Sequence, residues 1–343
     1  IIAAGYAYET EDGVYFDTRR LKNYGQLSRQ KTGLERKSRI PRQARDKKNP
    51  TDFALWLKTF GKHKNHLQVW DSPWGKGFPG WHIECSAMSE KYLGPQFDIH
   101  TGGVDHIPIH HENEIAQSVA ANNVIPAKFW LHSAFLLTDK QKMAKSENNF
   151  LTLKRIKEKG FDPLDFRFLC LTNHYKSPMI FNTKRLKAAS AAFSRLKEMV
   201  SRLNSVESKK TISSDFNQKI KDSESKIKKY FFDDLNIPLA LGQLFLLGHF
   251  LSQNMERLSQ KQAKKAISIF KEADQILALD LFKKREDDKI LKRIRDLAEL
   301  RQEARLKGDF KKADEFRKLI ENEGFKIEDL KKSFRILKKE EGK

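Results

Sequence analysis

The stretch from Pro79 to Glu114 constrains this chain more than any other part of its sequence. A cysteine, Cys85, lies before a Gly-rich turn, and a histidine–glutamate pair, His110 and Glu114, follows it. Thiolate, imidazole and carboxylate are the side-chain groups that zinc accepts. On a helix, two residues four apart lie on one face and can reach the same ion. The stretch therefore predicts a zinc site.

The wide spacing of these residues favours a metal with a working role. A tight Cys-x-x-Cys clip, as in many structural zinc sites, does not occur in the sequence. The alternative is a buried Cys85 beside an exposed His-Glu pair. A metalloprotease motif is excluded, because His111 and Glu112 are followed by Ile115 where that motif needs its second histidine.

Composition limits the classes of protein to which the chain can belong. Its 343 residues allow two or three domains with buried cores, and 39% hydrophobic residues suit a globular protein. No apolar run is long enough to span a bilayer and no signal peptide is visible, so we expect a cytoplasmic protein that uses no membrane. Two cysteines, Cys85 and Cys170, argue against a disulfide framework.

The net charge of +21 indicates a polyanionic partner such as nucleic acid. The alternative interpretation is a lysine-rich surface that is merely solvated. The chain also begins IIAAGYAYE, without an initiator methionine, and these residues read as the interior of a domain. We expect the reading frame to be truncated.

Turn and periodicity signals predict an α/β arrangement in the first 150 residues. An Asp-Gly turn at Asp12 and Gly13 predicts a hairpin between AYET and VYFDT. Ligands on a parallel sheet bind beyond the carboxyl ends of its strands, where the Gly102-Gly103 turn is expected. The further elements expected here are helices over Asp52–Phe60, Gly80–Leu93 and Glu112–Asn122, a strand over Phe97–His100, and a strand or turn over Phe129–Leu137.

From about Leu151 the apolar spacing is helical almost throughout. A last unit, Lys289–Lys343, is expected to hold two charged amphipathic helices and a tail. The predicted fold class is thus α/β followed by all-α. The main helices are expected over Thr183–Leu203, Ile220–Tyr230, Ile237–Ser252 and Ala263–Ala278.

Six blocks of this sequence resemble cysteinyl-tRNA synthetase, a class I aminoacyl-tRNA synthetase. They occur in the order of that family and cover nearly the whole chain. The blocks are DFALW at Asp52–Trp56, WDSPWGKGFPGWHIECSAMS at Trp70–Ser89, HHENEIAQS at His110–Ser118, KMAKS at Lys142–Ser146, DDLNIPLAL at Asp233–Leu241 and RQEARLKGDFKKADEFRKLI at Arg301–Ile320.

The resemblance implies three parts. Residues 1–150 would be the second half of a Rossmann-like catalytic domain. Residues 151–285 would be a connecting segment and a tRNA-binding helical bundle. Residues 286–343 would be a small anticodon-recognition domain. The resemblance does not identify the residues that read the anticodon.

By resemblance, Cys85, His110 and Glu114 bind a zinc ion that selects the thiol of the substrate cysteine. A zinc–sulfur bond discriminates cysteine from serine more strongly than pocket size can. The family draws a fourth ligand from an upstream cysteine that this sequence lacks. Trp81 would form part of the amino-acid pocket, and Asp105 would help to hold the amino group of the substrate.

The KMAKS block resembles the KMSKS loop of class I synthetases. Lys145 and Lys142 would bind the triphosphate of ATP and stabilise the charge that develops as pyrophosphate leaves. Ala144 replaces the usual serine, and Asn148 stands where a glycine is usual. Because both lysines are retained, we expect the function of the loop to survive these departures.

The implied activity is cysteine–tRNA ligation: ATP-dependent formation of cysteinyl-adenylate, with Mg²⁺, and transfer to tRNA(Cys). No HIGH-type motif, the other ATP-binding motif of this class, occurs in the sequence. We therefore expect the chain alone to be inactive. We expect it to be a monomer.

Two other hypotheses remain open. One is the cysteine ligase of mycothiol biosynthesis, a relative with a similar catalytic core. The other is a non-catalytic tRNA-binding protein derived from a synthetase. The anticodon-type unit at Lys289–Lys343, with its strong basicity, argues against the first. The retained metal trio and both loop lysines argue against the second.

Overall fold

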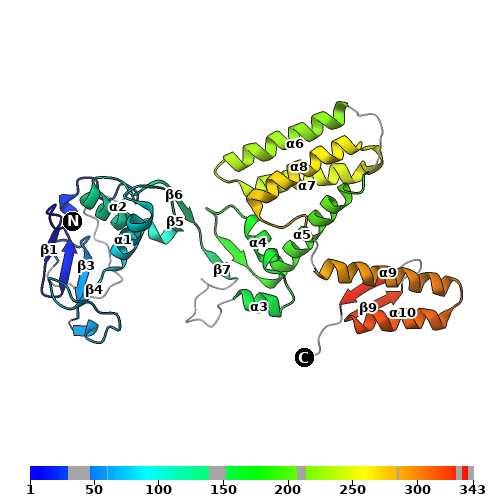
Figure 1. The fold of residues 1–343 in the computed structure, drawn as a ribbon, viewed down its shortest axis with the longest axis horizontal. Coiled ribbons are helices and arrows are strands. Elements are labelled where there is room, and N and C mark those ends of the chain that lie inside the picture. Colours follow the sequence, from blue (N-terminus) through cyan, green and yellow to red (C-terminus); the bar gives the residue numbers. More distant parts are fainter. Residues whose placement is uncertain are drawn as a thin grey trace. The chain divides into compact units, whose positions relative to one another are not determined.

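The structure is a computed structural model of the chain (Figure 1). It describes residues 1–29, 47–59, 61–138, 152–206, 214–283, 286–329 and 334–338. The chain forms two compact units. The first consists of residues 1–193 and 228–242, and the second of residues 194–227 and 243–343. The division of the chain at residues 150 and 285 stays a prediction.

A four-stranded antiparallel sheet lies at the start of the first unit. Its strands follow one another in the order β1-β2-β3-β4. The predicted hairpin is confirmed, because Ala7 pairs with Phe16 and Glu9 with Val14. The strands are β1 Ala7–Glu9, β2 Gly13–Phe16, β3 Phe53–Lys58 and β4 Gly77–Pro79.

The helix predicted over Asp52–Phe60 is wrong, because β3 is a strand within this sheet. Phe53 and Leu55 are buried while Ala54 and Trp56 are less so, which is the alternation of a half-buried strand. The strand pairs with β2 on one side and β4 on the other. A short apolar run has no periodicity that separates helix from strand, and here the flanking strands decide.

Two helices and a parallel strand pair follow the sheet. The predicted helices are confirmed, and α2 begins two residues earlier than expected. The predicted strand at Phe97 continues through Gly103, and it pairs with β6 in parallel. The elements are α1 Trp81–Leu93, β5 Phe97–Gly103, the 3-10 turn η3 Val104–His106, α2 His110–Asn122 and β6 Ala127–Ser133.

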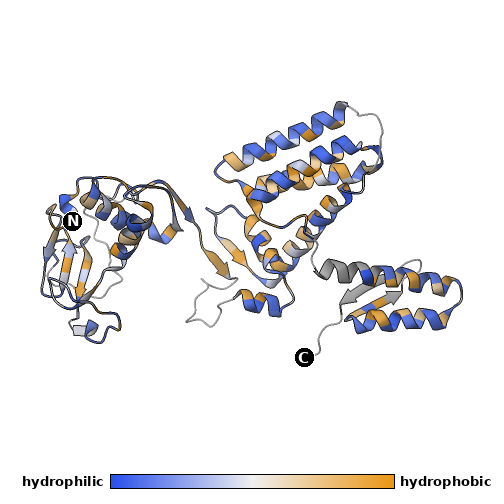
Figure 2. Ribbon diagram, in the orientation of Figure 1, coloured by the Kyte–Doolittle hydropathy of each residue, from blue (hydrophilic) through white to orange (hydrophobic). Residues whose placement is uncertain are grey.

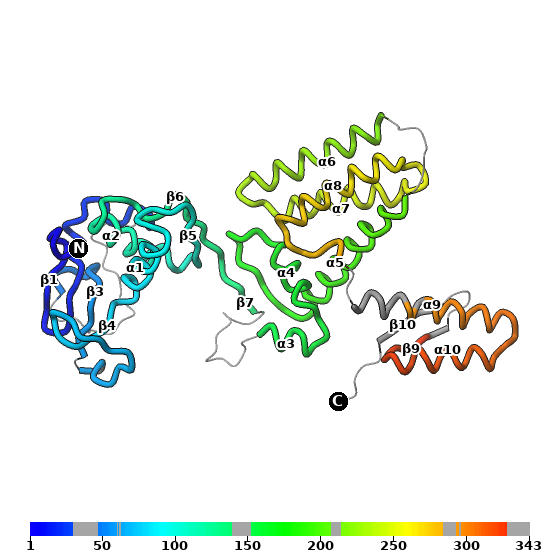
Figure 3. The backbone as a smooth tube through the Cα atoms, in the orientation of Figure 1, coloured from blue at the N-terminus to red at the C-terminus, as the bar shows by residue number. Residues whose placement is uncertain are grey.

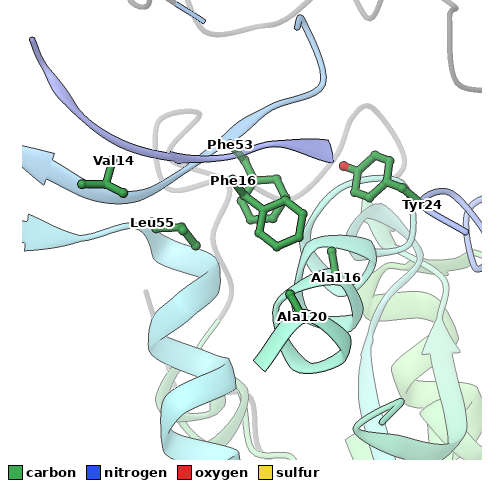
Figure 4. Packing of buried hydrophobic residues seen from close by; sticks show 7 residues of the cluster. All are labelled: Val14, Phe16, Tyr24, Phe53, Leu55, Ala116 and Ala120. Carbon is green, nitrogen blue, oxygen red and sulfur yellow. The ribbon is translucent and has the colours of Figure 1, made fainter. Parts of the chain in front are cut away.

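The core of this region joins the antiparallel sheet to α2 (Figure 4). Phe16 and Phe53 stack with ring centroids 4.9 Å apart. Ala116 and Ala120 come from the facing side of α2, where small side chains let the helix approach the rings. The sheet therefore fixes the helix that carries the predicted metal ligands.

The first unit also contains two short helices and a second parallel strand pair. Asp162 begins α4 with a capping box, since its side chain accepts from the helix backbone while Asp165 bonds back. The segment Phe129–Leu137, expected as a strand or turn, contains the end of β6 and the start of the next strand, β7. The elements are β7 Leu136–Thr138, α3 Leu153–Glu158, α4 Pro163–Leu171 and β8 Met179–Phe181, with β7 parallel to β8.

Long helices dominate the second half of the chain (Figure 3). Hydrophobic and hydrophilic residues alternate along them (Figure 2), as expected for amphipathic helices. Phe216 of α6 contacts Phe250 of α7, with ring centroids 5.1 Å apart. The predicted helices are confirmed as α5 Thr183–Leu203, α6 Ser214–Phe232, α7 Ile237–Gln253 and α8 Gln260–Leu277.

The C-terminal part of the second unit has its own small core. This part of the chain consists of α9 Glu286–Leu306, α10 Phe310–Asn322 and the antiparallel strands β9 Phe325–Asp329 and β10 Phe334–Lys338. Two helices were predicted here, but the hairpin was expected only as a tail. In the described parts of the chain, no helix combines the length and apolar character that a membrane crossing needs. The buried side chains of the core are Ile294, Ala298, Ile320, Phe325 and Ile327.

Candidate metal centre

Helices α1 and α2 bring the three predicted zinc ligands together. Cys85 lies on α1, and His110 and Glu114 lie at the start of α2. One ligand atom from each residue lies within 4.8 Å of the others. His110 and Glu114 are buried, whereas Cys85 is half-buried. The site thus has two buried ligands and one that is partly open to solvent.

The packing of α1 against α2 sets this geometry. The hydroxyl of Ser86 lies 2.6 Å from the side-chain amide of Gln117, and both residues are buried. Ser86 follows Cys85 directly, and Gln117 lies one turn beyond Glu114. The hydrogen bond therefore fixes the relative position of the two ligand-bearing segments.

The donor atoms fit a zinc ion. The Oε1 atom of Glu114 is buried and accepts no hydrogen bond, although His110 Nε2 lies 2.8 Å away. A buried polar atom in this state needs a partner, and a cation held by both residues supplies one. Thiolate, imidazole and carboxylate together form a donor set that zinc prefers.

Glu114 stays ionised across the physiological pH range. Burial alone would raise the pKa of its carboxyl group, but the interactions with His100 and His110 outweigh burial and lower the pKa to about 2. His100 Nε2 lies 3.1 Å from Oε2 of Glu114. Oε2 is thus held by His100 while Oε1 faces His110, so the carboxylate cannot rotate away from the site.

His82 supports His110, the other predicted ligand on α2. Its Nδ1 lies 2.8 Å from Nδ1 of His110, which leaves Nε2 of His110 directed at Glu114. Burial, with a smaller contribution from His110, lowers the pKa of His82 to about 4. His82 is therefore neutral at pH 7 and can share one proton with His110, as residues that orient metal ligands do.

A second donor set shares Glu114 with the first. His100, His111 and Glu114 also place one ligand atom each within 4.8 Å of the others. Nδ1 of His111 is bound to Nε2 of His132 at 2.8 Å, and burial lowers the pKa of His111 to about 3. A Cβ on Gly102 would lie 2.6 Å from the His111 ring, so only glycine admits this ring.

Glu112, which lies between the predicted ligands in the sequence, binds backbone groups of another segment of the chain. It is buried, and its carboxylate accepts from the backbone N–H groups of Gly25, Leu27 and Ser28 at 2.7–3.0 Å. Sequence reasoning missed this role. The spacing alone could have indicated it, because a residue two positions from both His110 and Glu114 lies on another side of the helix and cannot share their ion.

The remaining predicted site residues have different outcomes. Trp81 lies at the start of α1, is 62% exposed, and its ring centroid is 4.5 Å from that of His110. Asp105 is exposed on η3, between β5 and α2, and belongs to neither donor set. Lys142 and Lys145 lie outside the described residues.

The chain is similar to known proteins over nearly its whole length. Residues 1–191 match the family of tRNA synthetases class I (C), catalytic domain. The cysteine–tRNA ligase 1 of Burkholderia lata is 39% identical over 336 residues, 97% of this chain and 67% of that protein. Cysteine–tRNA ligases of Chlorobaculum tepidum and Thermococcus gammatolerans are 37% and 36% identical, over 96% and 95% of this chain and 68% and 70% of theirs.

These similarities establish the family. The chain belongs to the class I tRNA synthetases, among the cysteine–tRNA ligases. Its mixed α/β first part and helical second part agree with that class. A solved complex of a leucyl-tRNA synthetase from Agrobacterium radiobacter has a TM-score of 0.47 and 13% identity over 62% of this chain and 32% of that one, too little to bear on the fold.

Proposed function

We propose that this chain carries the thiol-selecting part of a cysteine–tRNA ligase. The enzyme activates L-cysteine with ATP and transfers the cysteinyl group to tRNA(Cys). The observation that carries the proposal is the convergence of Cys85, His110 and Glu114 from two packed helices within 4.8 Å. A buried carboxylate oxygen without a hydrogen bond supports it.

The residues of the chain select and position the substrate. When bound, zinc supplies a Lewis acid that prefers a thiolate to a hydroxyl, which separates cysteine from serine. Cys85, His110 and Glu114 hold the ion, while His82 and His100 hold His110 and Glu114 in place. Trp81 forms a wall beside His110, against which the substrate is confined.

Other parts of the proposal concern regions that bind ATP and tRNA. Lys142 and Lys145 are proposed to bind the triphosphate with Mg²⁺, and Asp105 the amino group of the substrate. The strand pair β5–β6 with α1 and α2 is proposed to be part of a Rossmann-like domain. The long helices and the small α9–α10 unit are proposed to bind tRNA, and the protein to act as a cytoplasmic monomer.

A cobalt-substitution experiment tests this proposal. Co²⁺ in place of zinc reports each sulfur ligand by a charge-transfer absorption band. Adding L-cysteine to the Co²⁺-loaded chain is expected to strengthen this band, because a second sulfur joins that of Cys85. L-serine is expected to leave it unchanged. An equal response to both amino acids would contradict thiol selection.

Binding of tRNA separates the two other hypotheses from this proposal. A mycothiol-pathway ligase predicts no affinity for tRNA(Cys). A non-catalytic RNA-binding protein predicts tRNA binding without a cysteine-dependent change in the cobalt spectrum. The proposed function requires both responses.

We expect the His100→Ala substitution to weaken zinc binding by roughly 10–100-fold, the usual effect of losing a residue that orients a metal ligand. The side chain holds Oε2 of Glu114 at 3.1 Å, and without it the carboxylate can rotate. Competition with a chromogenic chelator measures the affinity. His100→Gln keeps a donor and is expected to recover part of the loss. His249→Ala, at an exposed position on α7, is the matched control.

A further inference from the structure

A cavity of about 310 Å³ lies beside the metal centre, and the proposed chemistry does not use it. Neither Cys85, His110 nor Glu114 lines it. Trp81 belongs to both places, since it lines the cavity and its ring lies 4.5 Å from that of His110. A molecule in the cavity would therefore lie next to a cysteine whose thiol is held at the metal.

The walls of the cavity are aromatic. His66, Trp70, Phe78 and Trp81 contribute rings, with Leu57 and Pro79 between them. Trp70 and Trp81 are 51% and 62% exposed, so the cavity is open to solvent. Flat, accessible aromatic walls are suited to a planar ligand that stacks.

These walls are held in place by the loop between β3 and β4. Trp70 and Gly77 exchange two backbone hydrogen bonds of 2.8 and 2.9 Å, which close the loop behind the indole. The His66 ring stacks on Phe78 with centroids 3.7 Å apart and 6° between planes, and its Nδ1 lies 2.8 Å from the carbonyl oxygen of Gln68. Contacts within the chain thus hold three of the four rings, those of His66, Trp70 and Phe78.

The polar groups of the cavity are those that read a base edge. Glu84 presents a carboxylate, and Gln68 an amide that both donates and accepts. A carboxylate accepts from an exocyclic amino group, as in protein contacts to cytosine N4. Proteins recognise unpaired RNA bases by this combination of aromatic stacking and edge hydrogen bonds.

We infer that the cavity binds an unpaired nucleobase with an exocyclic amino group, at the single-stranded end of the tRNA that accepts the amino acid. The inference rests on the proposed function. The acceptor end must come close to the activated cysteine, and its cytosine and adenine bases carry amino groups. The loop between β3 and β4 also carries Lys64 and Lys76, cations that suit an RNA backbone nearby.

The test measures binding of fluorescently labelled tRNA(Cys) by anisotropy, using the zinc-loaded chain. One transcript is complete and the other lacks its three terminal nucleotides. The chain is expected to bind the complete transcript about tenfold more tightly, as stacking of one base on an aromatic ring predicts. Trp70→Ala is expected to abolish this preference, and Trp70→Phe, which retains a ring, to keep most of it.

Leu67→Ala is the matched control, because Leu67 lies on the same loop, is fully exposed and does not line the cavity. It is expected to change neither affinity. Equal binding of the two transcripts, or a preference that survives Trp70→Ala, would overturn the inference and leave the proposed function intact. Absence of any tRNA binding overturns both.

Discussion

Replacing Cys85 with serine is expected to cost the protein its zinc. A hydroxyl is a poor zinc ligand, whereas the thiolate is among the best. The loss in affinity should exceed about 100-fold, since removing a residue that only orients a ligand costs roughly 10–100-fold. Metal content after dialysis against a weak chelator measures the effect, and the cysteine-dependent change in the cobalt spectrum should disappear with it.

The second cysteine provides the control. Cys170 lies on α4 and belongs to neither donor set, so Cys170→Ser should retain the metal. The Cys85 variant also decides between the two sets that share Glu114. If it retains zinc at full affinity, the ion is held by His100, His111 and Glu114, and the proposed selection of thiols loses its basis.

Replacing Asp52 with asparagine is expected to destabilise the first unit by about 3 kcal/mol. The carboxylate is 2% exposed and accepts from Thr18 N, Thr18 Oγ1, Asn49 N and the hydroxyl of Tyr8 at 2.8–3.0 Å. An amide has one acceptor oxygen, so at least one buried donor loses its partner, at about 1–3 kcal/mol, and charge-assisted bonds become neutral.

Thermal unfolding followed by tryptophan fluorescence measures this loss. All five tryptophans, Trp56, Trp70, Trp74, Trp81 and Trp130, lie in the first unit. A fall in Tm of roughly 6–12 °C is expected for a unit of this size. Asp98→Asn removes a carboxylate that is 78% exposed and forms an ion pair with Lys128 at 2.9 Å, so its Tm should barely move. Equal effects of the two substitutions would refute the role given to Asp52.

The proximity of the proposed metal ligands was predictable because their chemistry is local and their spacing fits a helix. His110 and Glu114 share a face of α2 whatever the fold around them. The strand at Phe53–Lys58 was not predictable in this way. Its apolar run suits either a helix or a strand, and only the pairing with Gly13–Phe16 and Gly77–Pro79 makes it a strand.

The supporting residues of the site could not be read from the sequence for a related reason. The contact between His82 and His110 spans 28 positions, and that between Glu112 and Gly25 spans 87. Such contacts depend on how α1, α2 and the antiparallel sheet pack. The C-terminal hairpin was not predicted because its strands are short. The helices before it, α9 and α10, give the clearer hydrophobic periodicity in this part of the sequence.

The burial of α2 has a consequence for how freely it can vary. Every side chain from His110 to Ala116 is buried, although five of the seven residues are polar. One side of the helix carries the proposed metal ligands, another anchors the backbone at Gly25–Ser28, and a third packs on Phe16 and Phe53. In a saturation-mutagenesis library, the segment from His110 to Ala116 should accept almost no replacement, whereas Lys311 and Lys312 on the exposed side of α10 should accept most.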